Sequence, residues 1–87
     1  MNWDGFKRTR HDLARPLLVV SGSQGVLACG YLNIATFAAL NEAGAIVRGV
    51  SDFDDMLEAQ IVEASPAALQ LGVQIGMTGR QALDIFR

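Results

Sequence analysis

Cysteine and histidine each occur only once in this chain, and their scarcity excludes several kinds of site. Cys29 alone cannot form a disulfide within the chain, nor can it build a cysteine-based zinc site. Long apolar runs are also missing. The run Leu17–Val20 near the N-terminus is far too short for a signal peptide, or for a membrane span of about 20 residues. We therefore expect a cytoplasmic protein.

Charged residues are scarce as well, at 18% where soluble domains average about 25%. Hydrophobic residues reach 51%, and the mean hydropathy is +0.26. A chain of 87 residues forms one domain and buries only about 60–65% of the surface of its unfolded form. So much apolar surface exceeds what one subunit encloses, and we expect a homo-oligomer. The alternative is a compact monomer whose surface is rich in alanine and glycine.

The net charge of −2 and the pI of about 5.1 argue against nucleic-acid binding by the domain as a whole. The charge is nevertheless uneven, because residues 1–15 carry a local +2 and the remainder carries −4. Residues 1–15 either dock on an acidic face of a neighbouring subunit, contact a polyanion, or form a solvated basic strand. We favour the solvated strand. A polyanion-binding accessory protein acting through Lys7, Arg8 and Arg10 remains one alternative function.

Apolar runs and turn residues predict the order of the elements. Residues 1–12 form an N-terminal lead-in segment or edge strand, and residues 12–87 form a single domain. The runs Leu17–Val20 and Val26–Cys29 flank the turn residues 21–25, which favours a β-hairpin. We therefore predict an α+β fold class: a mixed β-sheet with an N-terminal β-hairpin followed by alternating short helices and strands.

Helix caps divide the rest of the chain. The expected helices are 33–43, one capped by Ser51 with Asp54, 65–71 closed by Gly72, and one opened by the pair Thr78 and Gln81. The expected strands are 45–50, 60–64 and a short extended piece at 73–75. Along the first helix, one face carries alanine at positions 35, 39 and 43. We interpret this stripe as a candidate subunit contact.

Cys29 is the first candidate for chemistry, because it ends a strand shortly before the helix expected at Asn33. The partial positive charge of a helix N-terminus favours a reactive thiolate. A nucleophile also needs a base, and the one histidine, His11, lies on a different strand. A thiol-dependent enzyme is therefore an alternative function, although a lone cysteine is more often a small buried hydrophobic residue.

Arg48 is the second candidate, because alternation along its strand predicts a partly buried side chain on the face of Ile46 and Val50. Its partner is either an acid, such as Glu63 or one of residues 52–58, or a bound anion. A further anion site is conceivable at Thr78, Gly79 and Arg80, where backbone N–H groups open the last helix. Structural capping explains the same residues, and phosphate-loop and dinucleotide spacings are absent.

The acidic cluster formed by Asp52, Asp54, Asp55 and Glu58 has no calcium-loop spacing, and we interpret it as a complement to a helix dipole. No metal or cofactor is expected. The leading hypothesis is an uncharacterised homo-oligomeric domain with a small-anion site near Arg48, Thr78 and Arg80.

Three blocks of sequence together resemble the YunC-like family of bacterial and archaeal domains of unknown function. The blocks are Cys29-Gly30-Tyr31-Leu32-Asn33, Ile46-Val47-Arg48-Gly49-Val50 and Gly76-Met77-Thr78-Gly79-Arg80-Gln81-Ala82-Leu83. The resemblance covers roughly residues 12–86. It implies an α and β domain whose N-terminal β region takes part in a tetramer, and it implies no known activity, substrate or cofactor.

Overall fold

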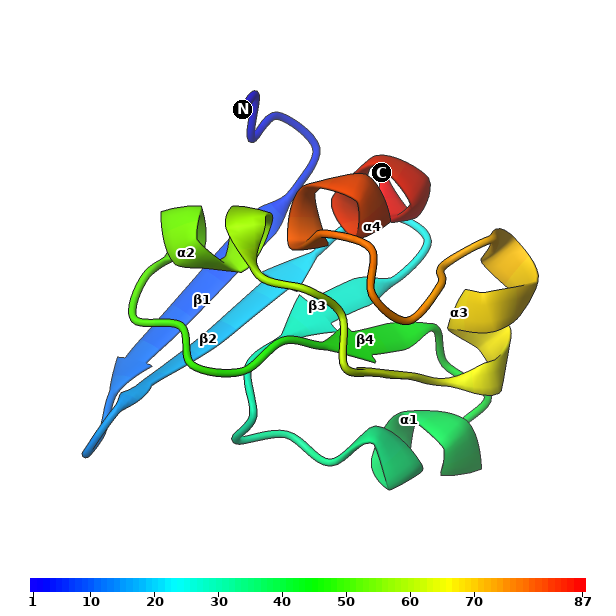
Figure 1. Cartoon of the computed structure of the whole chain (residues 1–87), viewed down its shortest axis with the longest axis horizontal. Coiled ribbons are helices and arrows are strands. Elements are labelled where there is room, and N and C mark those ends of the chain that lie inside the picture. The colour runs from blue at the N-terminus through cyan, green and yellow to red at the C-terminus, as the bar shows by residue number, and fades with distance from the viewer.

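The computed structural model describes residues 1–87 and contains one five-stranded sheet with four short helices (Figure 1). The strands are β1 (Lys7–Asp12), β2 (Pro16–Ser21), β3 (Val26–Ala28), β4 (Gly44–Ile46) and β5 (Glu63–Ala64). The helices are α1 (Ile34–Ala39), α2 (Phe53–Glu58), α3 (Pro66–Leu71) and α4 (Gly79–Phe86). The sheet order is β1-β2-β3-β4-β5, in which only β3 and β4 are parallel. The predicted α+β class with a mixed sheet is confirmed.

The predicted hairpin consists of β2 and β3, which pair antiparallel with Val20 opposite Leu27. Its turn lies against the end of the last helix. A Cβ atom at Gly25 would lie 2.3 Å from the ring of Phe86, so glycine allows that ring to pack on the turn. The N-terminal segment adds β1 as an edge strand, which pairs antiparallel with β2 along its whole length.

The connection from β3 to β4 passes through α1 and is shorter than predicted. Asn33 caps the helix through its side chain, which accepts a hydrogen bond from the Ala35 N–H. The helix ends at Ala39 rather than Ala43, because Asn41 adopts the left-handed conformation with φ of 55°. Ala43 is buried beside β4, so the expected alanine stripe is wrong as a continuous helix face.

The remaining helices begin at caps, and one cap differs from the prediction. Asp52, not Ser51, caps α2 by accepting from the Asp55 N–H, so the cap lies one residue later than expected. The caps of the last two helices are those predicted. Ser65 opens α3 with Gly72 closing it, and Thr78 forms a capping box with Gln81 at the start of α4.

Two strand predictions were too long. Pairing with β4 is confined to Glu63–Ala64, and Gln60 instead makes an isolated bridge to Thr78. Residues 73–75 are not a strand. β4 likewise ends at Ile46, so residues 47–50 lie outside the sheet. The prediction that Arg48 is partly buried in a strand is therefore wrong, because Arg48 is exposed.

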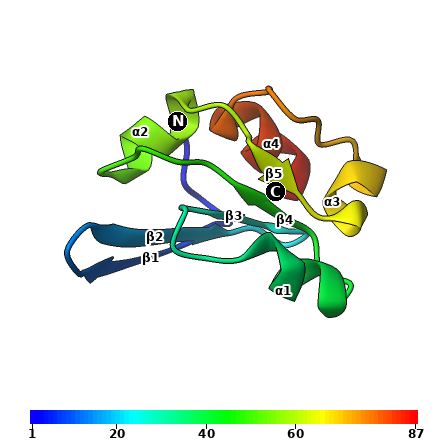
Figure 2. The ribbon, with the colours of Figure 1, turned by 60° about the horizontal axis from the view of Figure 1, so that its bottom comes forward.

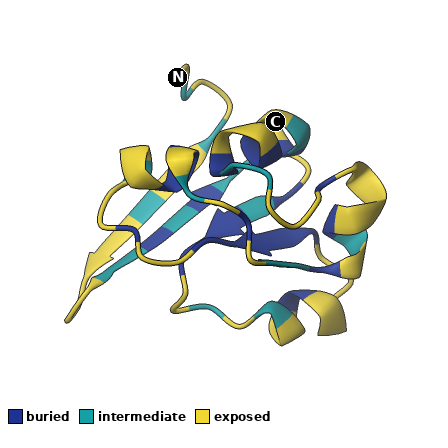
Figure 3. Cartoon of the chain, in the orientation of Figure 1, coloured by how far each residue is buried: buried dark blue, intermediate teal, exposed yellow.

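The two faces of the sheet are covered unequally. Helices α2, α3 and α4 lie on one face and enclose the larger core, whereas α1 lies alone on the other (Figure 2). The smaller core on that side consists of Ala28, Phe37 and Ile46. Buried residues are concentrated in the middle of the sheet, and the free end of β1 and β2 is exposed (Figure 3). No helix combines the length and the apolar composition that a membrane span requires.

The first residues fold back on the larger core. Trp3 contacts the rings of Phe6 and Phe53 in edge-on geometry, with centroid distances of 6.4 and 6.1 Å. The Arg8 guanidinium lies 4.8 Å from the Trp3 ring centroid, within the range of a cation–π contact. Aromatic packing therefore fixes the N-terminal segment against α2 and holds β1 at the sheet edge.

Candidate functional site

The parallel strands β3 and β4 end side by side, and the chain leaves the sheet after each of them. Cys29 follows β3 directly, and Val47 follows β4. In sheets with parallel strands, the space beyond the carboxyl ends is where ligands usually bind, because the connections diverge there. The segments 29–31 and 48–50 are therefore placed together by the pairing of their strands.

A pocket lies at this position, with a volume of about 230 Å³. Its eight lining residues come from the start of β2 and from the two segments after β3 and β4. They are Arg15, Pro16, Cys29, Gly30, Tyr31, Arg48, Gly49 and Val50. We call it the Arg15–Arg48 pocket.

Tyr31 and Gly30 shape the pocket wall. The Tyr31 hydroxyl accepts a hydrogen bond from the Arg15 backbone N–H at 3.2 Å, which joins the segment after β3 to the start of β2. A Cβ atom at Gly30 would lie 3.2 Å from Cγ of Arg48, which is tighter than ordinary packing. The absence of a side chain at position 30 therefore leaves room for the aliphatic stem of Arg48.

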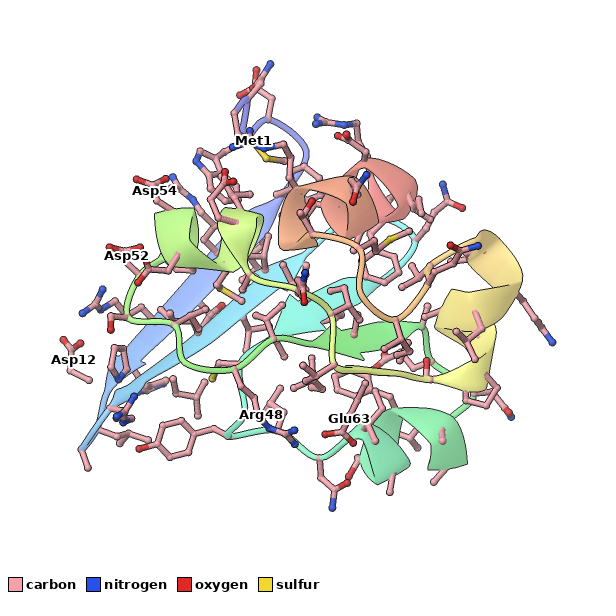
Figure 4. The ribbon with its side chains drawn as sticks, in the orientation of Figure 1. Met1, Asp12, Arg48, Asp52, Asp54 and Glu63 are labelled. Carbon is pink, nitrogen blue, oxygen red and sulfur yellow. The ribbon has the colours of Figure 1, made fainter.

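The electrostatics of the pocket are set by its two arginines. The Arg48 guanidinium forms an ion pair with Glu63 of β5, and Figure 4 shows the two side chains pointing toward each other below β4. Arg15 forms no ion pair with any carboxylate of the chain. Glu63 is one of the partners predicted for Arg48, whereas Arg15 was not among the predicted site residues.

Cys29 lies in the wall of the pocket and is only 4% exposed. Its sulfur accepts a hydrogen bond from the Leu18 N–H at 3.3 Å and lies 4.0 Å from the Pro16 carbonyl oxygen. His11, the base that a thiol enzyme would need, is paired with Leu17, the neighbour of Leu18. Side chains alternate between faces along a strand, so His11 and Cys29 belong to opposite faces of the sheet. The chain does not bring them together.

The second predicted group, at the start of α4, is separate from Arg48. Arg80 pairs with Glu58 at 2.6 Å, and the Thr78 hydroxyl accepts from the Gln81 N–H at 3.2 Å. The Gly79 N–H donates to the Ala59 carbonyl at 2.8 Å. Capping and an ion pair thus engage these groups, and Thr78, Gly79 and Arg80 do not line the pocket that contains Arg48.

The acidic residues near α2 serve the helix start. Asp52 caps it, and the Asp55 carboxylate accepts from the Ser51 N–H at 2.9 Å. Asp54 lies in the first turn, where a negative charge complements the helix dipole. In Figure 4 Asp52 and Asp54 project away from the domain. No group of three or more His, Cys, Asp or Glu side chains is arranged to hold a metal ion.

The basic N-terminal segment does not form a single stripe. Lys7 alternates with Arg8 along β1, so the two side chains belong to opposite faces of the sheet. Arg8 lies over aromatic rings, and Arg10 pairs with Asp12 at 2.9 Å. The positive charges proposed for a polyanion are therefore divided between the two faces and largely engaged within the chain.

Residues 28–86 match the family described as "Domain of unknown function (DUF1805)". The chain belongs to this family. The DUF1805 match starts at residue 28 rather than near residue 12, so β1 and β2 lie outside it. The family resemblance found in the sequence is confirmed.

Two relatives extend the comparison of this DUF1805 domain. It is 34% identical over 70 residues to the uncharacterized protein YunC of Bacillus subtilis (strain 168), covering 76% of this chain and 69% of that protein. The fold is similar to the crystal structure of TA1206, a protein of unknown function from Thermoplasma acidophilum. That likeness has a TM-score of 0.90 and 37% identity, and it covers 94% of this chain and 81% of the other.

Two of the three blocks that carry the resemblance to the DUF1805 family meet at the pocket. The first block supplies residues 29–31 of the lining and the second supplies residues 48–50. Sequence reasoning missed Arg15 and Tyr31, which come together only through tertiary structure. One feature of the sequence could have located the pocket: each of the first two blocks overlaps or follows a short β-type run, at the end of a strand.

Proposed function

We propose that the chain is a homo-oligomeric domain that binds a small anionic ligand in the Arg15–Arg48 pocket. The observation that carries the ligand proposal is the presence of two arginines in one pocket at the carboxyl ends of the two parallel strands. Guanidinium groups present several N–H donors in a planar fork, which suits carboxylate and phosphate oxygens.

The other lining residues support a small, partly apolar ligand. Pro16, Val50 and the Tyr31 ring supply apolar surface, while Gly30 and Gly49 expose backbone. A Cβ atom at Gly49 would meet nothing within 4 Å, so this part of the wall is open. Pockets for drug-sized molecules measure about 300–1,000 Å³, so a volume of about 230 Å³ indicates a smaller ligand.

Calorimetric titration with acetate, benzoate and inorganic phosphate tests this proposal. We expect at least one anion to bind the wild-type protein, and Arg15→Gln and Arg48→Gln each to weaken binding by about 10- to 100-fold. This range corresponds to the loss of about 1.5–3 kcal/mol for a hydrogen bond to a charged group. Arg80→Gln is the matched control, because its guanidinium pairs with Glu58 outside the pocket. Binding that survives both pocket substitutions would refute the proposal.

The proposed assembly rests on the uneven covering of the sheet. Thr9 of β1 lies opposite Val19 of β2, and both are half-buried on the face that α1 covers only at its β4 end (Figure 2). On α1, Ala35 and Ala39 are exposed, and so is Leu40 directly after the helix. Part of this sheet face is uncovered, and it lies beside an exposed apolar surface of α1. A second copy of the chain packed there would bury apolar side chains that one subunit cannot enclose. The family resemblance, which implies tetramer formation through the N-terminal β region, points to the same strands.

Light scattering of the purified protein tests the assembly. We expect a mass above that of one chain for the wild type, and a lower mass for Thr9→Glu, because a buried unpaired carboxylate at the contact is costly. Ala39→Glu reports whether α1 takes part, and Gln70→Glu on the exposed surface of α3 is the control. A wild-type protein that remains monomeric at high concentration would rule out the assembly, whereas the ligand proposal stands or falls on its own titration.

A further inference from the structure

The Arg48–Glu63 ion pair at the pocket is only partly shielded from water. The side chain of Arg48 is 58% exposed and that of Glu63 is 34% exposed. Only one terminal nitrogen of the guanidinium, Nη2, donates to Glu63, and its other N–H groups have no hydrogen-bond partner in the chain. Partly exposed ion pairs contribute little net stability, because water and salt screen both charges. Arg48 can therefore exchange Glu63 for another carboxylate at small cost.

The charges at the pocket limit what the ligand can carry. Arg15 and Arg48 contribute two positive charges, and Glu63 contributes one negative charge beside them. A ligand with a single negative charge balances this set. A second negative charge on the ligand would exceed this balance, and it would be repelled by the Glu63 carboxylate, whose charge the 34% exposure of that side chain leaves only partly screened.

The size of the pocket limits the remainder of the ligand. Its volume of about 230 Å³ is somewhat larger than the cavity of about 150 Å³ that accepts benzene in an engineered protein core. Tyr31 and Val50 add apolar wall beside the arginines. Room exists for one carboxylate and a short hydrocarbon or aromatic group.

We infer that the pocket selects small monocarboxylates and that Glu63 sets this selectivity; this inference rests on the proposed function. Without ligand, Glu63 holds Arg48 through their ion pair. The ligand carboxylate then replaces the Glu63 carboxylate on the Arg48 guanidinium. Glu63 keeps its negative charge beside the pocket, and this charge disfavours ligands with a second carboxylate. Glu63 acts here as a selectivity residue, since it lies outside the eight residues that line the pocket.

Butyrate and succinate form a suitable pair of probes, because both have four carbons and only succinate carries a second carboxylate. Their affinities are measured by amide NMR titration of the wild type, Glu63→Gln and Glu58→Gln. We expect the wild type to bind butyrate more tightly than succinate. Glu63→Gln should strengthen succinate binding by about tenfold, which is the scale of removing one like charge close to a partly exposed site.

The control variant and the outcomes separate the two proposals. Glu58→Gln removes a carboxylate that pairs with Arg80 away from the pocket, and both affinities should stay at wild-type values. Equal binding of butyrate and succinate by the wild type, or an unchanged succinate affinity in Glu63→Gln, would overturn the inference while leaving anion binding intact. Failure of the wild type to bind acetate, benzoate, phosphate or either of these probes would overturn the proposed function and the inference together.

Discussion

Ser65 is the one buried polar residue of the domain, and its replacement by alanine should be strongly destabilising. Its hydroxyl accepts a hydrogen bond from the Gly44 N–H at 2.9 Å and donates to the Glu42 carbonyl at 2.7 Å. The same oxygen caps α3 by accepting from the Ala68 N–H at 3.4 Å. One side chain thus joins the start of α3 to the start of β4.

The expected loss follows from these bonds. Removing the hydroxyl leaves the buried Gly44 N–H without a partner, which costs about 1–3 kcal/mol. Loss of the helix cap at α3 adds about 1 kcal/mol. The sum of about 2–4 kcal/mol is a large share of the total for a domain of this size, since stability amounts to about 0.05–0.15 kcal/mol per residue.

Urea unfolding followed by circular dichroism measures the effect of Ser65→Ala. Ser23→Ala is the matched control, because Ser23 is exposed in the β2–β3 turn and should lose less than about 0.5 kcal/mol. A free energy of unfolding for Ser65→Ala within about 0.5 kcal/mol of the wild type would refute the assigned role of this hydroxyl.

Three further predictions concern the packing and the thiol. Gly44→Ala should lose about 1–3 kcal/mol in urea unfolding, because its Cβ would lie 2.5 Å from the Phe37 ring, and the additional change Phe37→Leu should recover part of the loss. Trp3→Ala should lose about 1–3 kcal/mol by the same assay through its contacts with Phe53 and Arg8, with Trp3→Phe losing less. Alkylation of the 4%-exposed Cys29 should be slow in the native protein and rapid in denaturant, and rapid native labelling would contradict the burial of the thiol.

Local signals predicted much of the fold. The glycine-bearing turn between two apolar runs identified the β2–β3 hairpin, and the pair Thr78 and Gln81 identified the start of α4. These features depend on neighbours within a few residues, so a single sequence carries the information. The overlong first helix has a local explanation too, because the apolar pattern continues through Asn41 while the backbone reverses there.

The pocket depends on contacts that local patterns do not encode. Cys29 and Arg48 were singled out separately, but their approach requires β3 and β4 to pair in parallel across 15 or more intervening residues. Arg15 carried no site signal of its own, because the proline after it restricts the backbone conformation and does not reveal where the arginine side chain lies. Tyr31 gained its role only through the hydrogen bond from the Arg15 N–H.

A crystal structure of the protein grown or soaked with butyrate would show directly whether the Arg15–Arg48 pocket binds a monocarboxylate. We expect density for the carboxylate within hydrogen-bond distance of the guanidinium groups of both Arg15 and Arg48, with Glu63 displaced from Arg48. An empty pocket, with butyrate bound instead beside Thr78 and Arg80 at the start of α4 or nowhere on the chain, would contradict this expectation.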